Sequence, residues 1–524
     1  MLGPGDRSVL NRLASLARLA AASACIAVLV AATQARPAGE AADPNDIFAK
    51  HAAAIGYSLA DGRMKPYIVE MTTTTEKKGG DTRTSTTVRK QAGAYFASAT
   101  AFKGRNSSDG FDGRGFWWAD ENGNVINAIG LARKYDVTWA VINAEAFGPA
   151  LPSELRTPTA TDYVVRVTPD SGVPADVYFN KTTYYIDRVV VDPNLEKEEE
   201  TYADYERHGQ VAFAGTRTSG ESTTKVTRFA WDAQLMAADF DRPSQRSYAS
   251  FPDSGSSVVP FDDKRSEISF EATVNGVKGT FILDTGTDGI YFSPSFAQRA
   301  QLPRLNTSAV SGIGGTVSTS VTQVDRFRVG DVELQHFYAT ISSHEFEGWD
   351  GFAGFDFLAQ VVCDINYDSH KLTITNPAVY KDDGKRVAIV IALDDHTPQI
   401  YATVNEKVKT YMDLDTGDSS SITFTRVFVD SNPGIVARGA EARFVGAGGL
   451  EEGYIGTIDQ FQVGPYQFFG IEADVIAGFK GFAAERLTQG LIGYQVLRRF
   501  NLTFDYRGGK LYLDLSKYGH QTKF

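Results

Sequence analysis

Between residue 44 and about residue 240 the chain alternates polar and apolar positions over short runs, as in EMTTTTEKK, DTRTSTTVRK and ADVYFNKTTYYIDRVVV. A period of two is typical of β-strands with one buried and one solvated face. Asn-Gly and Asp-Gly pairs punctuate the region, and such pairs form tight hairpin turns. The pattern therefore predicts an antiparallel, β-rich domain over residues 44–240.

The alternation stops at DRPSQRSYASFPDSGSSVVPFD, residues 241–262. This stretch is rich in Ser and Pro and has no clear period, so we interpret it as a linker. Strand-like patterning returns after it, and the following 260 or so residues contain an internal repeat.

Four blocks of the C-terminal region recur in the same order, at separations of 131 to 139 residues. The pairs are ATVNGVKGTFILDTG with ATVNEKVKTYMDLDTG, GIGG with GAGG, VDRFRVG with IDQFQVG, and GFAGFDFLAQVVCDINYDSHKLTI with GLIGYQVLRRFNLTFDYRGGKLYL. Conserved order with little drift indicates a duplicated β-rich unit. We place the two units at residues 263–377 and 385–517, which makes the whole chain mainly β.

Each unit carries Asp-Thr-Gly directly after an apolar run, with Asp284 in the first and Asp415 in the second. Similar domains that pack about a pseudo-twofold axis bring a feature near that axis against its own copy. Two carboxyl groups about 3 Å apart cannot both ionise easily, so they share one proton. The charged member can activate a water while the protonated member donates to a carbonyl oxygen. The repeat therefore predicts peptide hydrolysis by an Asp284/Asp415 dyad.

The recurring motifs FILDTGT, GIGG and GFAGFDFL resemble those of retroviral-type (retropepsin-like) aspartic proteases. The chain is similar to exported bacterial aspartyl proteases in which two such units are fused, and the resemblance covers both halves of residues 263–517. It implies two tandem β-barrel units in a pseudo-twofold, bilobal arrangement similar to that of pepsins. It also implies Asp284 and Asp415 as the catalytic pair.

The same resemblance implies supporting roles for residues around the pair. Thr285, Gly286, Thr416 and Gly417 would shape the active-site loops, with the two threonines interlocking beneath the carboxyl groups. Gly312, Gly314, Gly315, Gly446, Gly448 and Gly449 would form flap tips over a substrate strand. Phe352-Ala353-Gly354 and Leu491-Ile492-Gly493 would back the loops.

The second unit departs from the family pattern at two positions. A small residue follows the glycine in the family, and Thr287 fits, whereas Asp418 does not; Asp413 adds another carboxylate just before Asp415. Each extra carboxylate must protonate, turn into solvent or find a cation, which disturbs the shared proton. We expect activity at lower pH, or an inactive second half. The alternative function is a pseudo-protease that binds peptides or lipids in the periplasm without cutting them.

Three segments of the N-terminal region, DGFDGRGFWWADENGNV, VYFNKTTYYIDRVVV and TYADYERHGQVAFAGTR, are similar to lipoprotein-carrier-type β half-barrels. The likeness implies a sheet curved around a helix, with an apolar concavity for a lipid-like or peptide ligand. Trp117, Trp118, Tyr184 and Tyr185 either line that concavity or pack in the core, and core packing is the commoner role of such aromatics.

The N-terminus has the features of an export signal. Arg7, Arg12 and Arg18 precede an apolar stretch of about 14 residues from Leu19, and small residues follow it. That stretch is shorter than the roughly 20 residues that span a bilayer. We predict a signal peptide at residues 1–35, cleaved after Ala35, and a periplasmic or secreted protein without a stable membrane span.

The net charge and the reactive side chains limit which partners and cofactors we expect. A net charge of −12 argues against binding to nucleic acid or to an anionic membrane. Seven histidines show no metal-type spacing, and the one cysteine after the signal, Cys363, lies in an apolar run typical of a buried, inert thiol. We therefore expect a polypeptide substrate, no metal or other cofactor, and a monomer, with pairing of units between chains as the alternative.

Overall fold

The computed structural model describes most of the chain after residue 42. The described ranges are residues 43–57, 65–76, 82–192, 198–231, 233–312, 315–394, 396–446, 449–478 and 488–519. Residues Pro44–Phe524 form one compact unit. The predicted signal peptide, residues 1–35, lies outside the described residues. Within the described part, the helices are too short or too polar to cross a bilayer.

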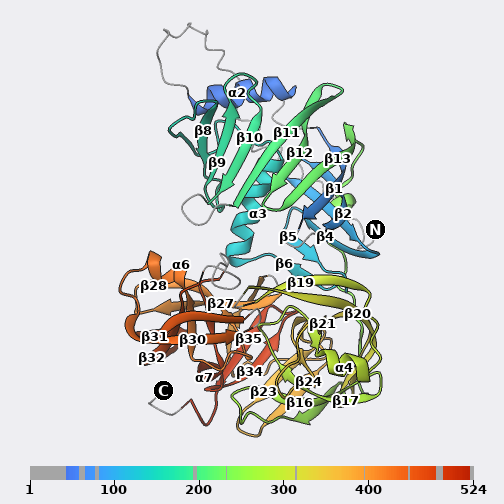
Figure 1. Ribbon diagram of the computed structural model, residues 1–524, viewed down its shortest axis with the longest axis vertical. Helices are drawn as coiled ribbons and strands as arrows, with labels where there is room; N and C mark the ends of the chain where they lie inside the picture. Colours follow the sequence, from blue (N-terminus) through green and yellow to red (C-terminus); the bar gives the residue numbers. More distant parts are fainter. Residues whose placement is uncertain are drawn as a thin grey trace, which may run out of the picture. The chain divides into compact units, whose positions relative to one another are not determined.

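The N-terminal region folds into one antiparallel sheet of 13 strands, ordered β6-β5-β4-β3-β2-β1-β13-β12-β11-β10-β9-β8-β7 (Figure 1). The strands are β1 Tyr67–Glu76, β2 Thr82–Ala92, β3 Tyr95–Phe102, β4 Arg105–Phe111, β5 Phe116–Ala119, β6 Val125–Asn127, β7 Ser153–Leu155, β8 Asp162–Val167, β9 Ala175–Asn180, β10 Ile186–Val191, β11 Glu198–His208, β12 Val211–Ser219 and β13 Ser222–Trp231. Helices α2 (Pro44–Ile55) and α3 (Gly130–Asn143) accompany them. The predicted half-barrel-like β domain is confirmed.

Helix α2 is held on this sheet by an aromatic cluster and one polar anchor. Phe48 packs against Phe147 and Phe179, at ring-centroid distances of 5.4 and 5.9 Å. His51 is buried, and its Nδ1 lies 2.7 Å from the carbonyl oxygen of Tyr184, while its Nε2 lies 2.8 Å from Glu145 Oε2. Each ring nitrogen of His51 thus has a polar partner within hydrogen-bond distance.

The four aromatic residues singled out in this domain pack against neighbouring side chains. Tyr184 stacks on Tyr163 at 6.1 Å and Tyr185 stacks on Tyr205 at 4.2 Å. Trp117 is buried. Trp118 packs edge-on to His396, at 4.5 Å. The cavity of this domain is lined by other residues, described below.

The C-terminal region contains the same series of strands and helices in two copies. The first copy runs β16 Ser269–Val274, β17 Val277–Leu283, β18 Ile290–Phe292, α4 Pro294–Arg299, β19 Asn306–Gly312, β20 Gly315–Val329, β21 Val332–Ser342, β22 Gly351–Ala353, α5 Phe355–Leu358, β23 Val362–Asn366 and β24 Lys371–Thr375. The second runs β27 Thr397–Val404, β28 Val408–Leu414, β29 Ile422–Thr425, α6 Arg426–Ser431, β30 Ala437–Gly446, β31 Gly449–Val463, β32 Tyr466–Ile476, β33 Gly490–Ile492, α7 Tyr494–Leu497, β34 Phe500–Asp505 and β35 Lys510–Leu515. The predicted tandem retropepsin-like units are confirmed.

Each unit has its own eight-stranded sheet, and the additional pairings β20–β21 and β27–β31 close six matching strands of each sheet into a ring. The first sheet has the order β14-β21-β18-β22-β17-β16-β20-β19, and the second has the order β26-β27-β28-β33-β29-β32-β31-β30, with β26 at Ala392–Asp394. In both, the strand before Asp-Thr-Gly pairs in parallel with a short strand from the end of the unit, Leu283 with Ala353 and Leu414 with Ile492. The interiors are apolar, with Phe281, for example, fully buried.

The two units share a six-stranded sheet, ordered β15-β24-β23-β34-β35-β25, with β25 at Val387–Val390. At its centre β23 of the first unit pairs antiparallel with β34 of the second, Cys363 opposite Phe504. Cys363 is a free, fully buried thiol whose pKa is raised by that burial, as expected for an inert cysteine. This sheet joins the two units through backbone hydrogen bonds.

Residues 241–262, predicted as a linker, are partly built into the sheets. Strand β14 (Ala249–Ser250) pairs with β21, and β15 (Ser256–Pro260) pairs with β24. Their side chains show little period because each strand docks on a sheet edge, where backbone groups supply the hydrogen bonds. The predicted bounds of the domains themselves stay a prediction.

The turn between β5 and β6 hydrogen-bonds to the first protease unit. Asn122 Nδ2 donates to Asp356 Oδ1 at 2.8 Å and to the carbonyl of Tyr338 at 2.9 Å, and its Oδ1 accepts from the Tyr338 amide at 2.7 Å. Gln360 Nε2 donates to Asn124 Oδ1 at 2.7 Å. These groups are buried, so the turn satisfies polar atoms of α5 that water cannot reach.

Candidate active site

The two Asp-Thr-Gly loops begin at the carboxyl ends of β17 and β28. The backbone amide of Asp284 donates to the carbonyl of Ala353 at 3.1 Å, and that of Asp415 donates to the carbonyl of Ile492 at 3.0 Å. A Cβ on Gly354 would lie 2.2 Å from Thr287 Oγ1, so only glycine allows this close packing. The segments predicted to back the loops are thus in direct contact with them.

Thr285 and Thr416 interlock through four buried hydrogen bonds. The amide of each threonine donates to the hydroxyl of the other, at 3.0 Å in both directions. Thr285 Oγ1 donates to the carbonyl of Leu414, and Thr416 Oγ1 donates to the carbonyl of Leu283, both at 2.6 Å. Each hydroxyl therefore accepts and donates across the axis, which fixes the two loops to each other.

Gly286 and Gly417 bring the carboxyl groups of Asp284 and Asp415 face to face. A Cβ on Gly286 would lie 2.6 Å from Asp415 Cγ, and one on Gly417 would lie 2.7 Å from Asp284 Cγ. Each glycine amide also donates to the aspartate of its own loop, at 2.9 Å to Asp284 Oδ1 and 2.8 Å to Asp415 Oδ1. Any larger residue would displace the opposite carboxyl group.

Burial raises the pKa of both carboxyl groups. The pKa of Asp284, 9% exposed, rises to about 6, and a hydrogen bond with Asp415 limits the rise. Burial raises the pKa of Asp415 well above its ordinary value, and the charges of Asp284 and Asp418 raise it further. The first proton to leave the pair therefore comes from Asp284, and the remaining proton stays on Asp415. Both directions are opposite to the expected move of the site to lower pH.

Asp418 is half-buried, and neighbouring Ser and Thr groups donate hydrogen bonds to its carboxyl group. Ser420 donates from its amide at 2.9 Å and its hydroxyl at 2.8 Å, and Thr423 Oγ1 donates at 3.1 Å. The Asp418 amide donates to Asp415 Oδ1 at 3.1 Å. Asp413 is buried on β28, in register with Gln399. The serine run that follows Asp418 in the sequence is the signal that marks this shell.

Asp474 on β32 belongs to the same acidic region and was missed in the sequence. Burial raises its pKa to about 7, and the charge of Asp418 contributes next. It lies in register with Thr423, at the place that Thr340 holds in the first unit, where the register partner is Tyr291. No motif marks Asp474, and only alignment of the two units strand by strand reveals the substitution.

The predicted flap glycines lie at the ends of two matching hairpins. Gly312 pairs with Gly315 between β19 and β20, and Gly446 pairs with Gly449 between β30 and β31. Gly449 has a φ of +126°, which favours glycine. Gly314 and Gly448 lie outside the described residues. Contact of these hairpins with a substrate stays a prediction.

Within the described ranges, no three His, Cys, Asp or Glu side chains are grouped so that they could hold a metal ion.

Comparison with known proteins supports the protease assignment. The aspartyl protease family model matches residues 270–356 and 400–496. A search of curated proteins finds no match.

Three solved structures are similar to parts of the chain. A retropepsin-like aspartic protease from Rickettsia conorii is 15% identical, with 23% of this chain and 90% of that one covered and a TM-score of 0.19. The aspartic proteinase from Irpex lacteus is 10% identical, covering 51% and 99% with a TM-score of 0.35. A putative outer membrane lipoprotein-sorting protein domain from Vibrio parahaemolyticus is 13% identical, covering 38% and 96% with a TM-score of 0.30. The two segments that match the aspartyl protease family model each contain one Asp-Thr-Gly loop, and both lie in a single chain.

Proposed function

We propose that this protein is an aspartic endopeptidase of the cell envelope. The observation that carries the proposal is the hydrogen-bonded carboxyl pair of Asp284 and Asp415, held by reciprocal threonine bonds. Raised pKa values keep one proton on the pair near neutral pH, which is the state that hydrolysis requires.

In this mechanism the two carboxyl groups divide the acid and base roles. Asp284, whose pKa is the lower of the two, takes a proton from a water held between the groups, and the water oxygen attacks the peptide carbonyl. Asp415 donates its proton to the carbonyl oxygen, giving a neutral tetrahedral intermediate. On collapse the intermediate returns a proton to Asp415, Asp284 protonates the leaving amine, and the C–N bond breaks. The pair ends with one proton, as it began.

An extended polypeptide is the substrate class that suits the hairpins β19–β20 and β30–β31. Their tips, Gly312 with Gly315 and Gly446 with Gly449, present backbone groups that pair with an extended chain by strand addition. Both loops come from one chain, so a monomer supplies a complete site with no cofactor. Residues 1–35 carry the export pattern, which supports a periplasmic or secreted location.

The test is cleavage of a quenched fluorogenic peptide by wild type, Asp284→Asn and Asp415→Asn. We expect each variant to lose at least about 10³-fold in kcat/KM with unchanged circular dichroism, and a statine-type transition-state analogue to inhibit the wild type. Asp325→Asn is the matched control, because its side chain is 72% exposed on β20. Undiminished cleavage by Asp284→Asn would refute the proposal.

A non-cleaving peptide-binding protein is the second candidate. The observation that favours it is the set of extra acidic residues in the second unit: Asp418 acts on Asp415, Asp474 is influenced by Asp418, and Asp413 is buried on the strand before Asp415. It predicts tight peptide binding with no turnover by the wild type at any pH from about 3 to 8, a range that spans ordinary and raised carboxyl pKa values. Turnover anywhere in that range would exclude it.

A further inference from the structure

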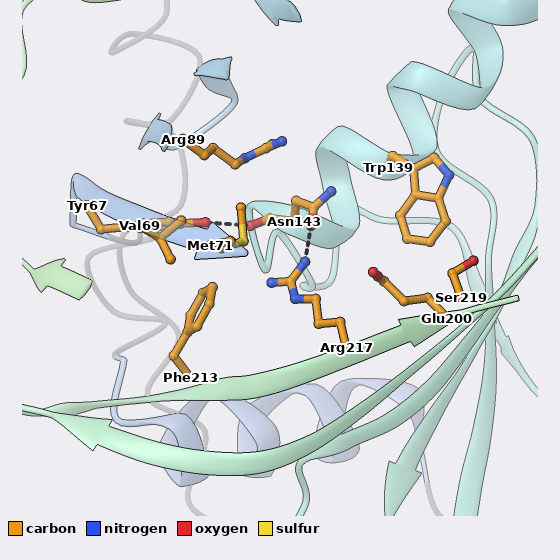
Figure 2. Close-up of a pocket in the computed structure, with 10 residues that line it drawn as sticks. All are labelled: Tyr67, Val69, Met71, Arg89, Trp139, Asn143, Glu200, Phe213, Arg217 and Ser219. Carbon is orange, nitrogen blue, oxygen red and sulfur yellow. Dashed lines mark hydrogen bonds between the residues drawn. The ribbon is translucent and has the colours of Figure 1, made fainter. Parts of the chain in front are cut away.

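The N-terminal domain contains a cavity of about 270 Å³ between helix α3 and the sheet (Figure 2). Its lining comes from α3 and from strands β1, β2, β11 and β12. The lining residues are Tyr67, Val69, Met71, Arg89, Trp139, Asn143, Glu200, Phe213, Arg217 and Ser219. The protease mechanism uses none of them.

Two guanidinium groups reach into this cavity from opposite sides. Arg89 comes from β2 and Arg217 from β12, and Figure 2 shows both pointing into the space beside Asn143. Arg217 Nη1 donates to Asn143 Oδ1 at 3.0 Å. One buried nitrogen of each guanidinium group, Arg89 Nη2 and Arg217 Nε, has no hydrogen-bond partner among the residues that the structure describes. An unpartnered buried donor is costly, and a bound acceptor would remove that cost.

The charges of the lining residues do not balance. Two guanidinium groups face one carboxylate, Glu200, which leaves one positive charge in excess. Burial lowers the pKa of Arg89, and repulsion by Arg217 adds to the effect, while the negative charge of Asp109 opposes it. Burial by itself would also lower the pKa of Arg217, but Glu200 and the neighbouring tyrosines outweigh it and raise that pKa. A ligand with one negative charge would neutralise the excess without introducing another.

The rest of the lining is mainly apolar. Val69, Met71 and Phe213 form one wall, and the indole of Trp139 lies across from them. A volume of about 270 Å³ exceeds the roughly 150 Å³ that accommodates benzene in an apolar protein cavity. The cavity therefore has room for an anionic head on an apolar group of several carbon atoms.

We propose that this cavity binds a monocarboxylate carried on a short apolar group, with Arg89 and Arg217 holding the carboxylate. Guanidinium groups match the planar carboxylate with paired donors, and the two unpartnered nitrogens supply such donors. A doubly charged phosphate would exceed the one positive charge available. The same chemistry is offered by a fatty acid and by the free carboxyl terminus of a peptide with an apolar last residue. This proposal does not depend on protease activity.

The test compares ligands that differ only in the carboxylate, by isothermal titration calorimetry on the purified full-length protein. Octanoate is paired with octan-1-ol, and the dipeptide Ala-Leu is paired with its carboxyl-terminal amide. We expect at least one acid to bind about tenfold or more tightly than its neutral partner, and the pair that shows the difference identifies the source. Equal affinity within both pairs, or no binding of either acid, would overturn the proposal.

Substitutions then locate the binding. Arg89→Met and Arg217→Met keep the length of the side chain and remove its charge, and each should weaken binding of the acid about tenfold or more. Arg228→Met is the matched control, because Arg228 is 73% exposed on neighbouring strand β13. Circular dichroism checks the fold of each variant. Retained acid binding in both folded variants would also overturn the proposal, and the wild-type ligand comparison decides the matter if a variant does not fold.

Discussion

The two protease units share a backbone plan and differ in charge. Across the axis, the hydrogen bonds of Thr285 and Thr416 match pair by pair, at 3.0 and 2.6 Å on both sides. Behind the loops the match ends. In the first unit Thr287 Oγ1 donates to the carbonyl of Asp284 at 2.9 Å. In the second, the corresponding residue is Asp418, a carboxylate held by hydroxyl donors.

This difference shows which part of the duplication the geometry constrains. The threonine contacts and the glycine approaches are reciprocal, so a change in one unit is felt at once by the other. The residue after each glycine contacts its own loop, and it can change in one unit alone. The loops are therefore symmetric while the charges around them are not: burial and the charge of Asp284 raise the pKa of Asp415, and the charge of Asp418 adds to the rise.

Removing either threonine hydroxyl should have the largest effect on stability, and the effect should be equal in the two units. Thr285→Val and Thr416→Val each remove a hydroxyl that makes two buried hydrogen bonds and leave an amide and a carbonyl unsatisfied. We expect each to lower the free energy of unfolding by about 3–4 kcal/mol. Urea unfolding measures this, with Thr285→Ser as the control that keeps the hydroxyl. A clearly smaller loss in one of the two units would break the symmetry.

Stability should fall as pH rises, because the buried carboxyl groups of the site have raised pKa values. The folded protein retains a proton on Asp284 up to about pH 6, which the unfolded chain loses near its ordinary pKa of 3.8. That group therefore costs up to about 2–3 kcal/mol at pH 8 and almost nothing below pH 4.

Comparison of wild type with Asp284→Asn by urea unfolding, at about pH 4.5 and pH 8, isolates this contribution. The variant should lose less stability than wild type between the two pH values. Equal losses would show that Asp284 ionises at its ordinary pKa, and Asp325→Asn should behave as wild type.

The short helices α5 and α7 give the next contrast. Asp356 on α5 is buried and accepts from Asn122, whereas the corresponding residue of α7, Gln495, has only long hydrogen bonds of 3.3 to 3.4 Å. We expect Asn122→Ala to cost about 1–2 kcal/mol of unfolding free energy, because it removes a donor from a buried carboxyl group. Gln495→Ala should cost less than about 0.5 kcal/mol. Thermal or urea unfolding of both variants tests this contrast, and equal costs would contradict it.

The smallest expected effect is the most direct test of the difference in charge around the two loops. Asp418→Thr removes the negative charge beside Asp415 and should lower the pKa of Asp415. The reciprocal Thr287→Asp should raise the pKa of Asp284. The carboxyl carbon shifts of the two aspartates, followed by NMR across pH, report both changes without reference to activity. An unchanged Asp415 titration in Asp418→Thr would show that Asp418 does not contribute to this pKa.

Much of the fold and the central pair were predictable from the sequence, because the duplication is visible in it. Alignment of the two copies placed Asp284 against Asp415, and the structure brings them together. Asp474 and the hydroxyl shell of Asp418 were missed, since they depend on which strands lie side by side. Strands β14 and β15 were missed because sheet edges, not side-chain periods, define them. The cavity around Arg89 and Arg217 was also missed, because its lining residues are scattered over about 150 positions of the sequence.

The two units, joined through the pairing of β23 with β34, belong to one chain, and this has an evolutionary consequence. In a protein assembled from two identical chains, every substitution appears twice, so an aspartate at the position of Asp418 would place one extra negative charge on each side of the axis. A single polypeptide carries that charge once. Because the two copies are fused in one chain, one copy can change at a position while the other keeps its own residue.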